Sequence, residues 1–251
     1  MKAKLPLLFV ASCLACSISM AQGPGPASPA GISAGLTKLF KEFGGFTAKA
    51  EVQALDDAKK EIANVPMDFA LLDNKIRVGI DMTQIKSSTM APTEADQLKQ
   101  MGLSHVISII RPDKKIIYVI YPDQKSVLTV PMPQEDVDAA EKSPKIQKTA
   151  QGNETVDGHP CVKNKVVVSD DKGQMLDAIT WEASDLKNFP IQIQTKENGK
   201  VTMVHFRQVQ IEKPSINQFD PPKDHAQFKD MMELMQAVMK KGSPPSGTNS
   251  K

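Results

Sequence analysis

Apolar and polar side chains alternate with a period of two along most of this chain, and this pattern limits the folds open to it. In FTAKAEVQA, residues 46–54, every second residue from Phe46 to Ala54 is apolar, and the residues between them are Thr, Lys, Glu and Gln. A period of two is typical of a β-strand with one face in a core and the other in water, whereas the apolar residues of an amphipathic helix recur about every 3.6 residues. The sequence therefore predicts a mainly antiparallel β protein.

Turn residues divide the alternating stretches into strands. Asp73-Asn74 separates MDFALL from KIRVGI, which predicts a hairpin over residues 67–80. Residues 111–115 and 122–124, each with a Pro and an Asp, separate three further strands over residues 104–130. Four more strands follow residue 160, so about ten antiparallel strands are expected. These four are CVKNKVVV (161–168), LDAITWEA (176–183), FPIQIQTK (189–196) and VTMVHFRQVQI (201–211), with Asn198-Gly199 as a two-residue turn.

Segments with helical spacing interrupt the strands. A sheet with one apolar face must bury that face, and a few amphipathic helices are the covering that this chain offers. We therefore expect an α+β fold, mainly antiparallel β, in which the sheet curls into an incomplete, half-open β-barrel of about ten strands covered by helices. The helical segments are ISAGLTKLFKEF (32–43), PTEADQLKQMG (92–102), PQEDVDAAEK (133–142) and HAQFKDMMELMQAVMKKG (225–242).

Residues 1–21 have the features of a secretory signal peptide. Lys2 and Lys4 precede an apolar run over residues 5–15, and Ser-Met-Ala at 19–21 matches a small-x-small cleavage site. The run is shorter than the roughly 20 residues that a membrane-spanning helix needs, and no later segment approaches that length. The sequence therefore predicts a protein of the periplasm, or a secreted one, that does not span the membrane.

A lipoprotein signal is the competing interpretation of the same segment. Cys13 and Cys16 lie near the end of the apolar run, and one of them would be acylated after cleavage. In either case, residues 22–31 are rich in Gly and Pro and predict a flexible leader, and residues 242–251 predict a disordered tail. A single half-barrel domain is then expected over residues 32–241.

Charge and cysteine content exclude several classes of function. Without residues 1–21 the chain carries 29 basic and 29 acidic residues, because the whole chain has 31 and 29 and the signal contains two lysines. A formally neutral protein has no electrostatic reason to bind nucleic acid. Cys161 would be the single remaining cysteine, so an internal disulfide is not expected. No phosphate loop or paired-carboxylate signature is present, and no cofactor is predicted.

The stretch VDGHPCVKNKVVV, residues 156–168, places a His and a Cys two positions apart. A thiol nucleophile would need a base and an oxyanion donor, and a zinc site would need two further ligands. The other histidines are scattered singly, and Asp157-Gly158 with Pro160 is typical of a turn. We therefore interpret His159 and Cys161 as the start of a strand, with Cys161 half-buried as a small hydrophobe. No catalytic residue, no metal site and no enzymatic activity are expected.

A half-open barrel encloses a concave apolar surface, which is a natural place for a lipid or an acyl chain. Methionines on the last helix would give this surface an adaptable covering, although the same helix also fits the role of a plain cap on the core. Because polar residues alternate with apolar ones in these strands, Thr180, Glu182, Gln192 and Gln194 are expected to face away from this interior. The predicted ligand-binding residues are Val52, Val78, Ile179, Trp181, Ile191, Ile193, Met231 and Met235.

Four stretches resemble an uncharacterised family of exported bacterial proteins that is similar to the LolA and LolB type of lipoprotein carriers and receptors. The matching order is a strand ending in Arg-Pro-Asp, a Tyr-containing strand, a Pro turn, then Glu-x-Val-x-Gly-x-Pro-Cys opening a strand, and a Lys-Pro exit from the last strand. The stretches are IIRPDKKIIYVIYPDQKSVLTVP (109–131), ETVDGHPCVKNKVVV (154–168), WEASDLKNFPIQIQ (181–194) and FRQVQIEKPSINQFDPP (206–222).

The resemblance implies an incomplete barrel closed by helices, with a cavity that in the carriers holds the acyl chains of lipoproteins. It also implies an arginine that couples lid closure to cargo release, for which Arg77 and Arg111 are the candidates here.

The leading hypothesis is therefore a non-enzymatic periplasmic protein that binds a hydrophobic ligand or lipoprotein acyl chains. The alternative is an envelope sensor or scaffold that binds a protein partner and fills its core with its own side chains.

Overall fold

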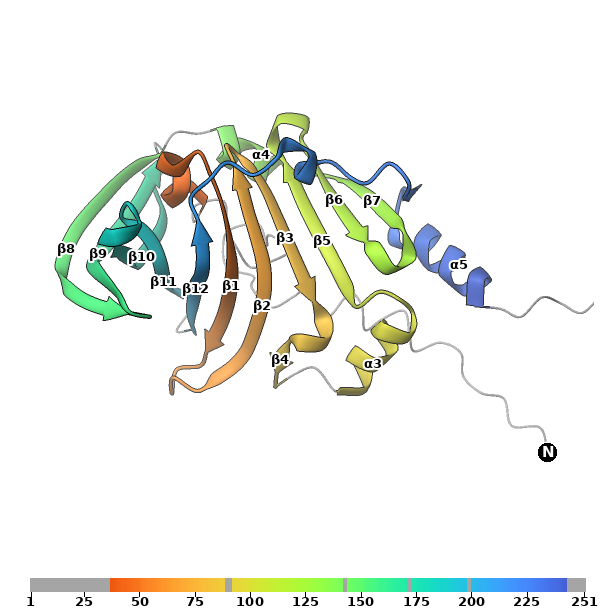
Figure 1. The fold of residues 1–251 in the computed structure, drawn as a ribbon, viewed down its shortest axis with the longest axis horizontal. Helices are drawn as coiled ribbons and strands as arrows, with labels where there is room; N and C mark the ends of the chain where they lie inside the picture. Colours follow the sequence, from red (N-terminus) through yellow and green to blue (C-terminus); the bar gives the residue numbers. More distant parts are fainter. Residues whose placement is uncertain (1–36, 89–91, 142–143, 171–172, 198–199, 243–251) are drawn as a thin grey trace, which may run out of the picture.

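A computed structural model describes residues 37–88, 92–141, 144–170, 173–197 and 200–242 of the chain (Figure 1). The predicted signal peptide with Cys13 and Cys16, the leader, the start of the first helical segment, most of the tail and the Asn198-Gly199 turn lie outside these residues.

The described residues form one sheet of 13 strands. The ten strands predicted from the sequence are all present, and β4, β8 and β13 are additional, so the predicted number was too low. All pairs are antiparallel except β13 with β7. The strands are β1 (Gly45–Leu55), β2 (Glu61–Leu72), β3 (Lys75–Asp81), β4 (Lys86–Ser87), β5 (His105–Arg111), β6 (Ile116–Tyr121), β7 (Ser126–Pro131), β8 (Lys145–Val156), β9 (His159–Asp170), β10 (Gly173–Ala183), β11 (Phe189–Glu197), β12 (Lys200–Gln210) and β13 (Ala226–Phe228).

Two meanders make up the sheet, joined where β1 pairs with β12. The order of neighbouring strands is β13-β7-β6-β5-β3-β2-β1-β12-β11-β10-β9-β8, and β4 pairs with β2. In the part of the chain that the structure describes, the end strands β13 and β8 are not paired with each other, so the sheet is open. Figure 1 shows it curving into a trough, with β8, β9 and β10 curled at one end.

Helices lie inside the trough and at its β7 end. Figure 1 shows α3 and α5 on the β7 side, whereas η1 lies near β1 and the β8–β10 end. The helix predicted over residues 225–242 begins only at Met231, because Ala226 pairs in parallel with Ser126 and brings the segment before it into the sheet. The helical elements are η1 (Lys38–Phe43), η2 (Met82–Gln84), α3 (Pro92–Gln100), η3 (Pro112–Lys114), η4 (Pro122–Gln124), α4 (Gln134–Glu141), η5 (Ser184–Leu186), η6 (Ile216–Phe219) and α5 (Met231–Gly242).

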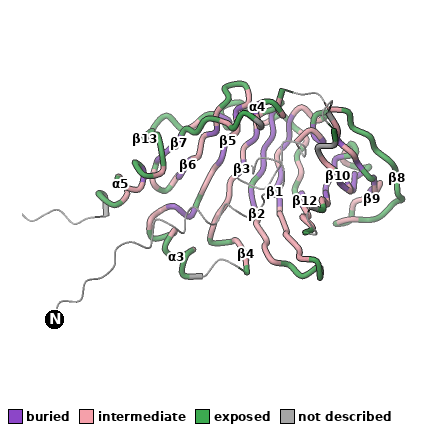
Figure 2. The backbone as a smooth tube through the Cα atoms, turned by 180° about the vertical axis from the view of Figure 1, so that it is seen from behind, coloured by how far each residue is buried: buried purple, intermediate pink, exposed green. Residues whose placement is uncertain are grey.

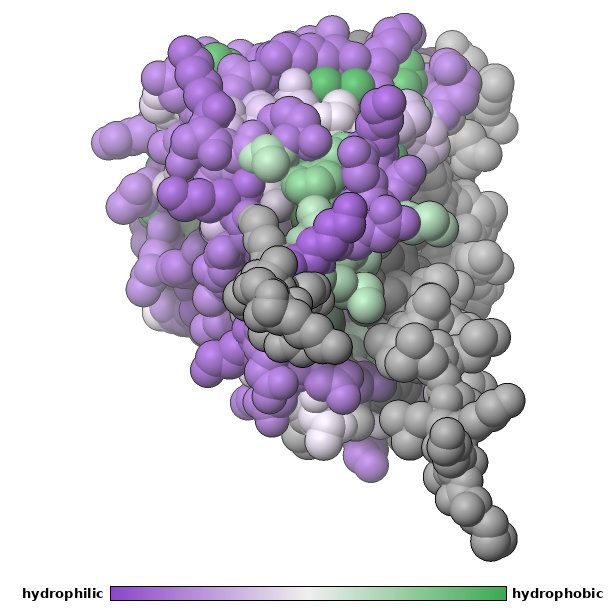
Figure 3. Space-filling model, turned by 90° about the vertical axis from the view of Figure 1, so that its right-hand side faces the viewer, coloured by the Kyte–Doolittle hydropathy of each residue, from purple (hydrophilic) through white to green (hydrophobic). Residues whose placement is uncertain are grey.

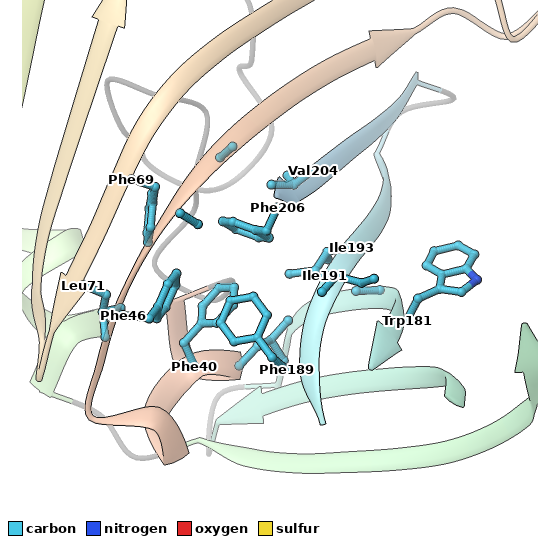
Figure 4. Packing of buried hydrophobic residues seen from close by; sticks show 14 of the residues in the cluster. Phe40, Phe46, Phe69, Leu71, Trp181, Phe189, Ile191, Ile193, Val204 and Phe206 are labelled. Atoms are coloured by element: carbon cyan, nitrogen blue, oxygen red, sulfur yellow. The ribbon is translucent and has the colours of Figure 1, made fainter. Parts of the chain in front are cut away.

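Five phenylalanines form the centre of the core on the concave face. The ring of Phe40, from η1, lies 5.0 Å from that of Phe46, 5.3 Å from that of Phe206 and 5.4 Å from that of Phe189, measured between centroids. Phe69 stacks on Phe46 at 5.4 Å. Figure 4 shows these rings pointing toward one another from η1, β1, β2, β11 and β12. The cluster therefore joins the two meanders across the β1–β12 pair.

The convex face has a core of its own, under the segment that follows β12. In Figure 1 this segment crosses the sheet toward β7. Phe219 of η6 is fully buried and packs with apolar residues that point away from the concave face. The fold therefore buries apolar residues on both faces of β2, β5 and β6, whereas the sequence predicted one buried face. The convex cluster consists of Ala70, Leu72, Ile109, Ile120, Val127 and Phe219.

Arg111 holds this crossing segment on the sheet. Its guanidinium makes a fork with Asp113, with Nε at 2.9 Å from Oδ1 and Nη2 at 2.8 Å from Oδ2. Nη1 donates to the Phe219 carbonyl at 2.9 Å and pairs with Asp220. The side chain is only 6% exposed. Lys114 also reaches Asp220, at 2.9 Å, but it is exposed.

We expect Arg111→Met to lower the free energy of unfolding by about 2–4 kcal/mol, because it leaves a buried carbonyl and two carboxylates without their donor. Lys114→Met removes a partner of the same Asp220 from an exposed position and should change it by less than about 1 kcal/mol. Denaturant unfolding of the two variants measures the difference. Equal losses would show that Arg111 acts only as a surface ion pair.

The same contacts predict a dependence on pH. The Arg111 guanidinium holds the pKa of Asp113 below its usual value, and Lys114 followed by Arg111 does the same for the pKa of Asp220. A carboxylate with a lowered folded-state pKa stabilises the protein above its unfolded-state pKa of about 4, and this contribution is lost as the pH falls through the folded-state pKa. The difference in stability between the wild type and Arg111→Met should therefore be largest near neutral pH and shrink below about pH 4. Unfolding curves across this range measure it, and a constant difference would mean that the Phe219 carbonyl, not the carboxylates, accounts for the effect.

Candidate functional site

The apolar surface of the concave face extends beyond the aromatic cluster into a region that the protein covers only in part. Val52 faces Val65 across β1 and β2. Ile80 faces Val106 across β3 and β5, and Met67 of β2 pairs with Ile80, so these side chains form one continuous stripe. Figure 2 shows β1, β2 and β3 buried toward the aromatic cluster and partly buried beyond it. We call the stripe of Val52, Val65, Ile80 and Val106 the open half of the trough.

The other half of the trough is filled by the protein itself. Three of the predicted ligand-binding residues, Val78, Ile191 and Ile193, are at most 2% exposed. They pack in the same core as the five phenylalanines. A ligand would reach them only if this core opened. Val52, in contrast, is partly buried and belongs to the open half.

Met231 and Met235, also predicted to bind ligand, lie on α5 at the β7 end. They are partly buried against a cluster that contains Tyr121, Leu128 and the fully buried Leu234. Val106 of the open half packs against the same cluster. Figure 3, which views this end of the molecule, shows hydrophobic side chains gathered on the surface between hydrophilic ones. The structure thus brings three predicted residues, Val52, Met231 and Met235, to the partly covered apolar surface or the cluster that borders it.

Trp181 is buried in the same core cluster as Ile191 and Ile193, and Ile179 packs against this cluster, but the two residues do not share the strand face of Ile193. In the register of β10 and β11, Trp181 is opposite Gln192 and Thr180 is opposite Ile193. Figure 4 shows the Trp181 ring pointing away from the aromatic cluster. The register shifts by one residue directly after Trp181, and such a bulge cannot be read from alternation alone.

Two neighbouring strands give Trp181 its polar partners on the convex side. Its indole Nε1 donates to Glu154 of β8 at 2.7 Å. The Lys163 ammonium lies 4.9 Å from the ring centroid and 2.8 Å from the Glu154 carboxylate. An indole has an apolar ring and a polar N–H, so the ring can be buried, at 5% exposed, while the N–H binds a carboxylate.

Thr180 and Glu182, predicted to face solvent, are buried on the concave side instead. Glu182 accepts a hydrogen bond from the Thr180 hydroxyl at 3.1 Å and pairs with the Lys148 ammonium at 2.8 Å. Its side chain is 9% exposed, whereas that of Lys148 is 40% exposed. Asn164 of β9 is opposite Thr180 and is also buried. The concave surface at the β8–β10 end therefore contains a buried polar group beside apolar residues such as Val166 and Ala178, and the sequence did not reveal it because β8 was not predicted.

His159 and Cys161 are the start of a strand, as the sequence predicted. Asp157 and Gly158 form the turn with positive φ values of 50° and 85°, and β9 begins at His159. The His159 ring Nδ1 lies 2.8 Å from Asp185, and the Cys161 thiol donates to the His159 backbone carbonyl. Burial raises the pKa of the thiol. Cys161 is fully, not half, buried, and its imidazole neighbour is turned to another partner, so the pair lacks the geometry of an activated nucleophile.

The two candidate arginines both lie on the convex side. Arg77 is opposite Ile109, a member of the convex cluster, and Arg111 is bound in the contacts with η6 described above. Neither reaches the open half of the trough. The arginine that the family resemblance implied is therefore not found among the concave-face residues that the structure describes.

Two further properties bear on the kind of site. Within residues 37–242, where described, no three His, Cys, Asp or Glu side chains come together as a metal site would require. No helix among the same residues has the length and apolar content to cross a membrane.

We expect Lys148→Met to destabilise the protein by about 1–2 kcal/mol, because it leaves the buried Glu182 carboxylate without its cation. The double variant Lys148→Met/Glu182→Gln should regain most of the lost stability, because a neutral amide needs no cation. Lys145→Met, at an exposed position of the same strand, should change the stability by less than about 0.5 kcal/mol. Thermal and denaturant unfolding measure all three, and an unaffected Lys148→Met would show that Glu182 is not held by this pair.

Comparison with known proteins gives only distant structural similarity. No protein-family model and no curated protein matches the chain. A LolA superfamily protein from Nitrosomonas europaea is 10% identical, with a TM-score of 0.36, over 74% of this chain and 96% of its own. The lipoprotein LppX from Mycobacterium tuberculosis is 12% identical, with a TM-score of 0.40, over 75% of this chain and 100% of its own. LprF from Mycobacterium bovis is 13% identical, with a TM-score of 0.39, over 80% of this chain and 100% of its own.

Similarity at this level carries no information about what this chain binds. The solved structures similar to it include LolA superfamily proteins and lipoproteins.

Proposed function

We propose that this chain is a non-enzymatic protein of the bacterial envelope that binds a hydrophobic ligand, a lipid or an acyl chain, on the open half of the trough. The observation that carries the proposal is the stripe of Val52, Val65, Ile80 and Val106, which continues the core but is only partly covered. Burial of aliphatic surface contributes about 25 cal/mol per Å², so an acyl chain laid along this stripe would be held without any polar contact.

The surroundings of the stripe favour an apolar ligand. Leu98 and Met101, at the α3 end, pack with Met231 and Met235 of α5 in the cluster that Val106 joins. Methionine side chains are flexible and polarisable, so this border can adapt to ligands of different shape. The half-barrel shape, the periplasmic location, an acyl-anchored lipoprotein as cargo and a partner in the envelope belong to the same proposal, and they rest on the signal sequence and the family resemblance.

The rival function is a sensor or scaffold whose core is closed. The five phenylalanines that fill one half of the trough favour it, because they leave no room there for a ligand. The two functions differ in whether the open half takes up a hydrophobic probe.

The substitution Val52→Lys should weaken the binding of a hydrophobic probe. The change Val52→Lys puts a charge on the concave side, where an acyl chain would have to desolvate it, and we expect affinity to fall by about tenfold or more. Gln53→Lys adds the same charge to the next residue of β1, which faces the convex side, and should leave affinity unchanged. Titration of the delipidated protein with a fluorescent fatty acid, displaced by palmitate, measures both.

Native mass spectrometry of the protein purified from its own cells without detergent provides a second measurement. A bound mass that extracts as a lipid is the expected result. A bare polypeptide that also takes up no fatty acid would contradict the proposal and favour the scaffold. Equal loss of binding in the two lysine variants would place the ligand elsewhere.

A further inference from the structure

A polar hollow of about 290 Å³ opens on the convex face, on the opposite side of the sheet from the trough. Its floor is formed by four adjacent strands, β3, β2, β1 and β12, and Gln218 of η6 stands at its edge. Ligand sites of small molecules have volumes of about 300 Å³ and more, so the hollow is at the lower limit of that range. The lining residues are Thr47, Ala48, Lys49, Asp68, Phe69, Ala70, Arg77, Gln208, Gln210 and Gln218.

Arg77 is the unusual group in this hollow. Among the described residues no hydrogen-bond or ion-pair partner contacts its guanidinium, although the side chain is partly buried. Burial lowers the pKa of Arg77 from its usual value, and the charge of Asp68 opposes this only in part. Arg111 and Arg207, in contrast, are each held by two carboxylates. A partly buried guanidinium without a bound anion can form an ion pair and hydrogen bonds with an anionic ligand.

The other charges of the hollow cancel. The Lys49 ammonium forms an ion pair with Asp68, which leaves Arg77 as the excess charge. Gly79, on the same face two residues from Arg77, has no side chain, and the Arg77 Nη1 atom lies 4.0 Å from where its Cβ would be. A side chain at this position would contact Asp68, Ile107 and the guanidinium, so the glycine keeps further atoms away from Arg77.

Side-chain amides supply the remaining donors. Gln210 accepts the Thr47 hydroxyl on its Oε1 at 3.3 Å, which leaves its NH₂ group as a donor. Gln208 sits at a bulge in β12, with a φ of 51°, where the register with β1 shifts. Bulges redirect side chains and are frequent at binding sites. A cation surrounded by amide N–H groups matches a planar or tetrahedral oxyanion.

We propose that this convex hollow binds a carboxylate or phosphate group through Arg77, with Gln208, Gln210 and Gln218 as further donors. The site is separate from the trough, so it stands whether or not the trough binds a lipid. The two sources of such a group, a free small anion and the headgroup of a larger molecule, share this chemistry.

The first test is titration of the full mature chain with sodium phosphate and with sodium acetate at constant ionic strength, followed by amide chemical shifts. We expect saturable shifts centred on residues 47–49, 77–79 and 208–210. Arg77→Gln should weaken binding by about tenfold or more, since a hydrogen bond to a charged group is lost. Saturation with phosphate or acetate alone would identify which anion geometry fits, and a short-chain phosphatidic acid that binds more tightly than free phosphate would indicate a headgroup.

Arg207→Gln is the matched control. It removes the same charge from the same face, on the residue next to Gln208, but Arg207 does not line the hollow. It should leave anion binding unchanged. Equal losses in the two variants, or the absence of saturable shifts with either salt, would overturn the proposal.

The substitution Gln218→Glu separates an effect on anion binding from an effect on folding. Gln218 is exposed on η6, so this change introduces a negative charge at the edge of the hollow without touching the core. It should abolish anion binding while the melting temperature is unchanged. Retained binding in Gln218→Glu would exclude the hollow as the site.

Discussion

The ring of Phe40 packs against rings from β1, β11 and β12, and this contact joins the two meanders across the concave face of the sheet. Phe46 lies near the start of the first meander, and Phe189 and Phe206 lie in the second, so one side chain of η1 bridges both. Aromatic pairs of this kind contribute about 0.5–1.5 kcal/mol each beyond the area that they bury. Because the rings converge only when β1 pairs with β12, the two meanders are expected to unfold together and not as separate units.

Burial of both faces is the second constraint on the structure. A curved sheet exposes its convex face, and here that face carries isoleucines in β5 and β6 that need a cover of their own. Phe219 supplies it, and Arg111 fixes the segment that carries Phe219. The requirement is visible in the sequence: HVISIIR and IIYVIY contain consecutive apolar residues where a one-faced strand would alternate. Continuous apolar runs indicate strands buried on both sides.

The strands that could be predicted from the sequence are those with a clear apolar alternation and with turn residues at their ends. The turns at residues 111–115 and 122–124 form as expected, with Pro at the first position of η3 and η4 and a lysine in the left-handed region after each. The prediction missed β8, whose residues are exposed along nearly its whole length and therefore show no apolar period. It also missed the parallel pairing of β13, since three residues carry too little pattern to be recognised.

The candidate site was predictable only where alternation continued without interruption. Val52 lies on β1, which keeps its period, and it belongs to the open half of the trough. Trp181 lies beside a bulge, and its polar partners come from β8, which the sequence did not reveal. The sequence assigned Trp181 to the core, where it is buried, but its contacts with Glu154 and Lys163 could not be predicted. The convex hollow could not be predicted from the sequence. Arg77 is distant in sequence from the glutamines, and all of them occupy positions that the alternating pattern assigns to the solvent-facing side of a strand.

The polarity of the concave surface indicates which way the proposed acyl chain would lie along the trough. Toward β8–β10 the concave surface carries the buried Glu182 with Lys148, and an acyl chain there would strip water from a charged pair. Toward β5 and α5 it meets Val106, Met231 and Met235, which offer only apolar and polarisable atoms. A chain that starts against Val52 therefore gains by running toward α5 and loses by running toward β8. The trough thus has two halves. One half is filled by the aromatic cluster, as the scaffold hypothesis requires, and the other is the partly covered surface that the carrier hypothesis requires. The edge of the aromatic cluster is the boundary between them.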